Sequence, residues 1–114
     1  MSSANVVPKD SAYRYFANLA AQLPEINEDT IVSRTLYDGE QVRAVLFGFA
    51  AGQELSEHTA AKRALLYFVS GQAQLTLGGD EVKAEAGTFV EMPPHLPHSV
   101  AAETEVVMLL LLLS

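Results

Sequence analysis

From residue 30 onward, apolar and polar residues alternate or form short apolar blocks that end at Gly, Pro or Asp. The clearest alternation lies over 73–77 and 82–86, where every second residue is apolar, on either side of Gly78-Gly79-Asp80. Two such segments joined by a glycine-rich turn predict a half-exposed β-hairpin. Further strands are predicted over 30–37, 42–50, 64–69, 88–92, 99–101 and 106–113. This many short strands predict an all-β chain, folded as an antiparallel sandwich or barrel.

Two of the predicted strands, 64–69 and 106–113, are apolar at nearly every residue and therefore on both faces. A small barrel buries only the inner face of each strand. The outer faces of these two strands would be left in water, where a long apolar strand promotes aggregation. We therefore expect a second copy of the chain to cover them in a homodimer.

The N-terminal residues carry weaker signals. Residues 1–10 are predicted to form a flexible tail, and residues 11–30 an extension that precedes a barrel domain over 31–114. Between Ser11 and Pro24, apolar side chains recur at spacings of three and four, which is typical of one face of a short helix. The side chains on that face would be Tyr13, Phe16, Leu19, Ala20 and Leu23.

Composition and charge exclude several classes of function. The net charge is −7 and the seven Lys and Arg residues are scattered, so the chain lacks the basic surface that nucleic-acid binding requires. The absence of Cys excludes disulfides, thiolate catalysis and zinc–thiolate sites. The longest apolar run, 106–113, is far shorter than the roughly twenty residues of a membrane span. Residues 1–10 lack the apolar core of a signal peptide, so we expect a cytoplasmic protein.

Two segments with regular spacing carry the candidate chemistry. Each begins at a glycine, contains a histidine and lies beside predicted strands, and the predicted hairpin separates them. The anchor residues are Gly52, His58 and Gly71 in the first segment, and Gly87, Pro93 and His98 in the second. Their order and spacing resemble the two motifs of the cupin superfamily. The resemblance implies a double-stranded β-helix, the RmlC-like jelly-roll barrel of that superfamily.

The resemblance also implies a metal site that is reduced in this chain. Metal-binding cupins hold iron, manganese, nickel or zinc with two histidines and a glutamate from the first motif and a histidine from the second. Here only His58 and His98 match those ligands, because the other two positions carry Ala60 and Ala64. Two imidazoles alone make a weak site for a divalent ion, since stable sites usually have three or more protein ligands.

The second motif departs from the family pattern as well. His95 stands in place of a glycine and Ala102 in place of an asparagine. Histidine tolerates the positive φ that the glycine position can require. His95, close to His98 in the chain, and Glu91, between two apolar residues of a predicted strand, are candidates for a further metal ligand.

The resemblance implies that His58 and His98 project into the barrel mouth from neighbouring strands. We predict that Phe47, Leu66 and Met92 provide apolar walls of a ligand pocket around them. The first hypothesis is a small-molecule-binding barrel without strong metal-dependent catalysis, whose ligand is a small aromatic or carboxylated metabolite. An alternative is a metal-dependent enzyme, similar to cupin dioxygenases or isomerases, with Zn, Ni, Mn or Fe held by both histidines and one further ligand. A metal-free enzyme with a histidine as general base is a third hypothesis.

Overall fold

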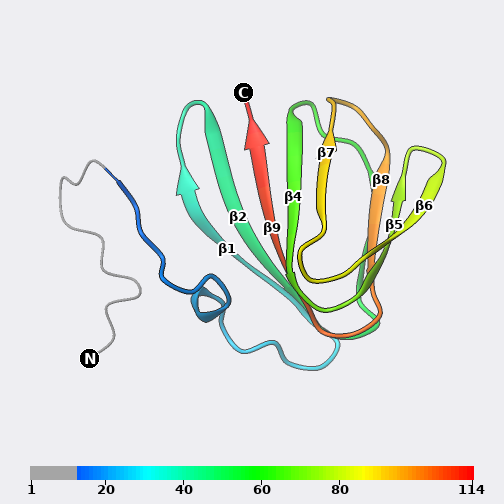
Figure 1. Cartoon of the computed structure of the whole chain (residues 1–114), viewed down its shortest axis with the longest axis horizontal. Helices are drawn as coiled ribbons and strands as arrows, with labels where there is room; N and C mark the ends of the chain where they lie inside the picture. Colours follow the sequence, from blue (N-terminus) through cyan, green and yellow to red (C-terminus); the bar gives the residue numbers. More distant parts are fainter. Residues whose placement is uncertain (1–12) are drawn as a thin grey trace.

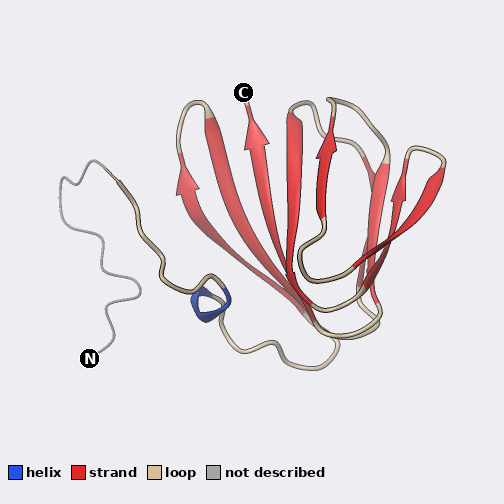
Figure 2. Cartoon of the chain, viewed as in Figure 1, coloured by secondary structure: helices blue, strands red, loops and turns tan. Residues whose placement is uncertain are grey.

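The computed structural model describes residues 13–114, and the regular secondary structure of this part of the chain is almost wholly β-strand (Figures 1 and 2). The strands are β1 (Ile31–Asp38), β2 (Val42–Phe49), β3 (Glu54–His58), β4 (Arg63–Ser70), β5 (Ala73–Leu77), β6 (Asp80–Ala84), β7 (Phe89–Met92), β8 (His98–Ala102) and β9 (Val106–Leu113). They form a five-stranded sheet in the order β1-β2-β9-β4-β7 and a four-stranded sheet in the order β3-β8-β5-β6. The all-β prediction is confirmed, while the predicted tail over 1–10 lies outside the described residues.

The hairpin of β5 and β6 forms where the alternation predicts it. Leu77 pairs with Asp80, so the turn consists of Gly78 and Gly79. Gly78 has a φ of 65°, a left-handed conformation that glycine adopts without steric cost and that tight hairpin turns require. The turn therefore fixes the register of the two strands.

The strand β3 is one that the hydrophobic pattern does not predict. Leu55 is its one partly buried residue, and the other four are exposed. One apolar residue in five gives no alternation to recognise, so the strand depends on its pairing with β8 at the edge of the four-stranded sheet. A tertiary contact, rather than local preference, determines this element.

The predicted N-terminal helix over 11–23 is wrong. In the described part of this segment, the regular structure is a single 3-10 turn, Ala20–Gln22. A helix of this length is marginal in water unless one face packs against the fold, and Tyr13 and Tyr15 remain 63% and 55% exposed. Instead, Gln22 is buried and its main-chain and side-chain oxygens accept hydrogen bonds from Arg34 Nη1 at 3.1 and 3.3 Å. No helix within residues 13–114 is long and apolar enough to span a membrane.

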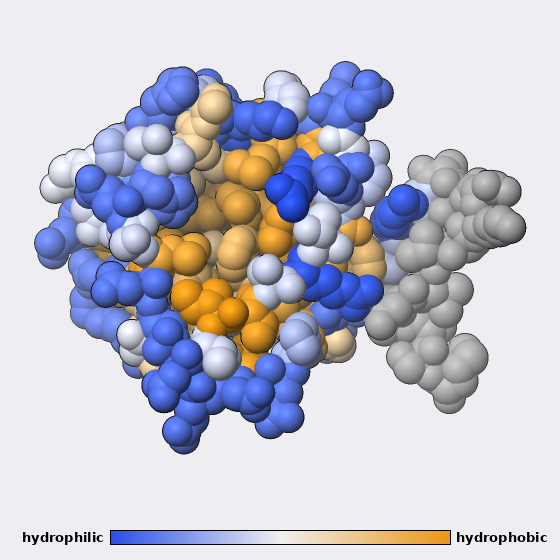
Figure 3. All heavy atoms as spheres, turned by 180° about the vertical axis from the view of Figure 1, so that it is seen from behind, coloured by the Kyte–Doolittle hydropathy of each residue, from blue (hydrophilic) through white to orange (hydrophobic). Residues whose placement is uncertain are grey.

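The hydrophobic core lies between the two sheets. Phe49, Phe68 and Leu75 are fully buried, and each stabilises the fold by about 1.5–3 kcal/mol on leaving water. The apolar side chains around this core are only partly buried, namely Ile31, Phe47, Leu55, Leu77, Val90, Leu96, Leu110 and Leu112. The interior is thus incompletely closed, and an apolar hollow framed by polar side chains is visible on the side opposite to that of Figure 1 (Figure 3).

Candidate functional site

The fold brings His58 and His98 together. His58 ends β3 and His98 begins β8, and the two residues pair directly in the antiparallel register. Their ring centroids are 4.3 Å apart and the ring planes are inclined by 57°. His98 is buried, with 8% of its surface exposed, whereas His58 is exposed. The His98 ring therefore lies in the barrel interior, and the His58 ring lies at the mouth of the barrel.

Both rings are held by the same local hydrogen bond. His58 Nδ1 lies 2.8 Å from the carbonyl oxygen of Ser56, and His98 Nδ1 lies 2.8 Å from that of Leu96. A carbonyl oxygen can only accept, so each Nδ1 carries the hydrogen and donates it. In a neutral imidazole this leaves Nε2 as a free lone pair. The backbone thus fixes the orientation of two neighbouring imidazoles and leaves both Nε2 atoms available to a ligand.

A bulge in β3 sets which side chains accompany the histidines. Leu55 pairs with Val100 and His58 with His98, so a step of three residues in β3 faces a step of two in β8. The extra residue places Leu55 and His58 on the same side, where a regular strand would place them on opposite sides. Regular alternation along β3 would therefore place Leu55 on the face away from His58. In β8, by contrast, Val100 lies two residues from His98 and on the same face, as alternation predicts.

The two histidines line a small apolar cavity of about 70 Å³. Its other walls are Phe47, Leu55, Leu66, Val100, Met108 and Leu110. Two of the predicted wall residues, Phe47 and Leu66, thus lie beside the histidines. Met92 is 1% exposed and belongs to the core, and within the described chain it is not among the residues that line this cavity. The enclosed space is well below the roughly 300–1,000 Å³ of a typical ligand pocket, so it holds a small group only.

The residues do not reproduce the metal centre of metal-binding cupins. Within residues 13–114, no three His, Cys, Asp or Glu side chains lie close enough together to hold a metal ion. Glu91 pairs with Leu65 across the sheet and forms an ion pair with Arg63, and it lies on the face opposite to the cavity-lining Leu66. His95 occupies an exposed turn with a φ of 71°, and its backbone N–H donates to the Ala60 carbonyl oxygen at 2.7 Å. Neither side chain completes a ligand set with the histidine pair.

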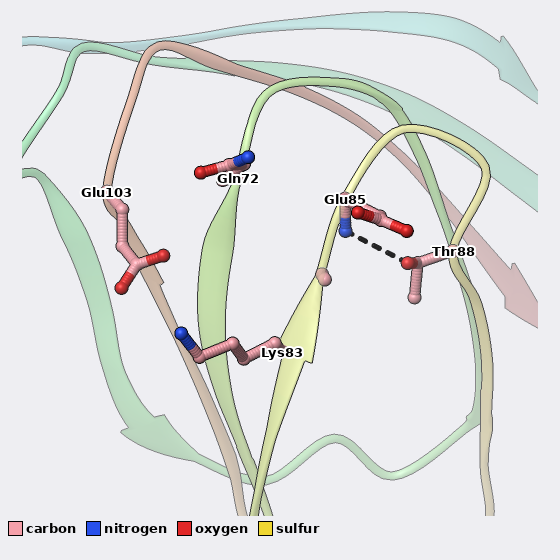
Figure 4. A pocket seen from close by; sticks show the side chains of 6 residues that line it. Gln72, Lys83, Glu85, Thr88 and Glu103 are labelled. Atoms are coloured by element: carbon pink, nitrogen blue, oxygen red, sulfur yellow. Dashed lines mark hydrogen bonds between the residues drawn. The ribbon is translucent and has the colours of Figure 1, made fainter.

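A second cleft lies at the other end of the four-stranded sheet (Figure 4). It measures about 330 Å³ and is lined by Gln72, Lys83, Ala84, Glu85, Thr88 and Glu103. Figure 4 shows Lys83 and Glu103 on one side and Glu85 and Thr88 on the other, with Thr88 Oγ1 accepting from the Glu85 N–H at 2.9 Å. This cleft is larger than the histidine cavity, but its charged side chains are exposed and most of its lining is polar. We therefore assign the candidate site to the histidine cavity.

Comparison with known proteins agrees with this architecture. A conserved protein of unknown function from Streptococcus pyogenes is 26% identical, with a TM-score of 0.80 over 100% of this chain and 96% of that one. A cupin superfamily protein from Desulfitobacterium hafniense is 26% identical, with a TM-score of 0.75 over 79% of this chain and 83% of that one. A cupin 2 conserved barrel domain protein from Leptotrichia buccalis is 27% identical, with a TM-score of 0.78 over 87% of this chain and 47% of that one.

No curated protein matches the chain. The family model described as a cupin domain matches residues 45–113, which is more than half of the chain and includes both histidines. The jelly-roll fold implied by the sequence motifs is thereby confirmed, and the chain belongs to the cupin family.

Proposed function

We propose that this cupin is a small-molecule-binding protein in which His58 and His98 hold the polar group of the ligand. The observation that carries the proposal is the paired arrangement of the two rings, 4.3 Å apart at the wall of one apolar cavity, each fixed through Nδ1 by a backbone carbonyl. Rings oriented in advance bind with less loss of conformational freedom. An apolar cavity with a few oriented polar groups is the usual composition of a small-molecule site.

The chemistry of the site favours a ligand with an apolar body and one hydroxyl or carboxyl group. Two Nε2 lone pairs can accept hydrogen bonds from a hydroxyl or from a protonated acid. Six apolar side chains form the remaining walls and favour an aromatic or aliphatic body. The cavity of about 70 Å³ has room for one end of such a molecule. The rest would lie at the mouth, beside the exposed ring of His58.

Binding is favoured over turnover because both histidines are oriented by neutral groups. A catalytic histidine is commonly supported by a carboxylate, which stabilises the imidazolium formed when the ring takes up a proton. In this protein the Nδ1 atoms of His58 and His98 donate to the carbonyl oxygens of Ser56 and Leu96. A carbonyl orients the ring but stabilises its positive charge less than a carboxylate does. β4 and β9, which are apolar at nearly every residue and therefore on both faces, further favour a homodimer as the binding unit.

Phenol and catechol test this proposal, because they join one aromatic ring to one or two hydroxyl groups that can donate to Nε2. Their affinities would be measured by calorimetry or NMR titration for the wild type, His58→Ala and His98→Ala. Each substitution removes one hydrogen-bond acceptor, so we expect at least one probe to bind about fivefold or more weakly to both variants. Circular dichroism would show that each variant is folded.

His95→Ala is the matched control, since His95 is exposed and lies outside the cavity. It should bind the probes as the wild type does, and added EDTA should leave the affinity unchanged. Equal probe affinity of the wild type and His98→Ala, or no binding of either probe to the wild type, would contradict the proposal. Loss of binding in EDTA would support the metal-dependent alternative instead.

A further inference from the structure

The histidine pair presents the cavity with two hydrogen-bond acceptors and no donor. Each Nδ1 carries a hydrogen that is already donated to a carbonyl oxygen, that of Ser56 for His58 and that of Leu96 for His98. In the neutral rings each Nε2 therefore has a lone pair and no hydrogen. A polar group that binds between the rings has to supply the hydrogens itself.

Both acceptors are open to a ligand. His58 is exposed at the mouth of the barrel. His98 is buried, yet within residues 13–114 no buried side-chain nitrogen or oxygen atom lacks a hydrogen-bond partner. Nε2 of His98 has no such partner in the described chain, so this atom is in contact with the cavity or with solvent. Because the ring centroids are only 4.3 Å apart, one small polar group can reach both rings.

The rest of the cavity lining offers neither a charge nor a hydrogen-bond donor. Among the described residues, the other side chains of the lining are aliphatic or aromatic, apart from the thioether of Met108. A bound cation would find no carboxylate there, and the burial of an unpaired charge is costly. An anion would receive no hydrogen from either Nε2, and the net charge of −7 would repel it. The site therefore favours a neutral polar group.

Among neutral groups, two adjacent hydroxyls match the two acceptors best. A single hydroxyl, whether of a phenol or of a protonated acid, has one hydrogen and leaves one Nε2 lone pair without a donor, which costs free energy in apolar surroundings. A primary amide has two hydrogens, but its carbonyl oxygen needs a donor that the lining does not provide. Two hydroxyls supply one hydrogen for each Nε2, and water at the mouth, beside the exposed His58, can donate to their oxygens.

We propose that the ligand carries two hydroxyl groups on adjacent carbon atoms, and that each hydroxyl donates its hydrogen to a different Nε2 of the histidine pair. This inference rests on the proposed function, because it specifies the polar group that the two histidines hold. The apolar lining favours an aromatic or aliphatic body, so the ligand class is that of catechols and apolar 1,2-diols. Hydroxyls at opposite ends of a molecule do not fit, because the cavity of about 70 Å³ admits one end only.

Catechol, phenol and hydroquinone test the inference, because they share one aromatic ring and differ in their hydroxyl groups. Catechol has two adjacent hydroxyls, phenol has one, and hydroquinone has two at opposite ends of the ring. Calorimetric titrations of the wild type would exclude oxygen, which oxidises catechol and hydroquinone, and would contain EDTA, because catechol also chelates metal ions. The second hydrogen bond should make catechol bind about fivefold or more tightly than either of the other two compounds.

His58→Ala and His98→Ala show whether the second hydroxyl acts at the histidine pair. Each variant retains one acceptor, so the advantage of catechol over phenol should fall to about twofold or less. His95→Ala is the matched control, because it keeps both acceptors of the cavity and should keep the full advantage. Circular dichroism would show that each variant is folded, and the comparison of the three compounds on the wild type needs no variant.

Equal affinity of the wild type for catechol and phenol, or for catechol and hydroquinone, would overturn the inference. An advantage of catechol that persists in both folded histidine variants would overturn it as well. In either case the proposed function would still stand if His98→Ala bound phenol or catechol more weakly than the wild type does. A wild type that binds none of the three compounds would refute the proposed function itself, and the inference with it.

Discussion

The clearest test of how the cavity relates to the core compares two leucine truncations. Leu66 is 2% exposed and lines the cavity, whereas Leu75 is fully buried in the same core and, within the described chain, is not among the residues that line the cavity. Truncation of either leucine to alanine removes apolar groups worth about 2.4 kcal/mol, at about 0.8 kcal/mol for each carbon. A new void adds to this loss and brings such variants into the range of about 2–5 kcal/mol.

The two sites should differ in how much the new void adds to the loss of stability. At Leu75 the void is enclosed, so we expect the upper part of that range, about 3.5–5 kcal/mol for Leu75→Ala. At Leu66 the void joins a cavity that has polar groups and a mouth, where water can enter, so we expect about 2–3 kcal/mol for Leu66→Ala.

Urea unfolding followed by far-UV circular dichroism measures both losses, and the sequence contains no Trp that would serve as a fluorescent probe. Both variants must be measured at one chain concentration, because dissociation of the proposed dimer would contribute to the apparent stability. In addition, Leu66→Ala should change phenol affinity and Leu75→Ala should not. A loss at Leu66 equal to or greater than that at Leu75, together with unchanged phenol affinity, would refute the placement of Leu66 at the cavity.

Two further predictions concern single positions of the fold. Gly71→Ala should destabilise the protein by about 2 kcal/mol or more in urea unfolding, because Gly71 has a φ of 91° and a Cβ there would lie 2.1 Å from the Glu105 carbonyl oxygen. If the variant were as stable as the wild type, the backbone at Glu105 would not approach Gly71 so closely. Arg63→Ala should cost less than about 1 kcal/mol in urea unfolding, and less still at high salt, because the side chains of Arg63 and Glu91 are 48% and 45% exposed. A cost above about 2 kcal/mol would contradict the exposed placement of this ion pair.

The sequence predicts much of this fold because its strands follow simple patterns. The alternation around Gly78-Gly79 locates β5 and β6, and the glycine positions separate the longer apolar strands. The N-terminal segment shows the limit of such patterns, since a helical spacing over 11–23 corresponds, within its described residues 13–23, to a single 3-10 turn. Spacing of apolar residues indicates a helix only where the rest of the fold offers a surface for one face to pack against.

The candidate site is less predictable, for a specific geometric reason. The spacing of the two motifs indicates His58 and His98 as partners, and they pair directly in the structure. Which other residues line the cavity depends on the face of the sheet to which each side chain points. The bulge in β3 reverses that face for Leu55. β9 is apolar on both faces, so the pattern alone does not tell that Leu110 rather than Leu111 lines the cavity.

The central claim is that His58 and His98 present two free Nε2 atoms to one ligand, and nitrogen-15 NMR of the imidazole rings tests it most directly. At a pH where the rings are neutral, we expect protonated Nδ1 and unprotonated Nε2 in both residues. Saturating phenol or catechol, whose hydroxyl groups can donate to Nε2, should then shift both Nε2 resonances and leave those of His95 in place. Protonated Nε2 atoms in the free protein, or ligand-induced shifts at neither histidine of the pair, would contradict the account.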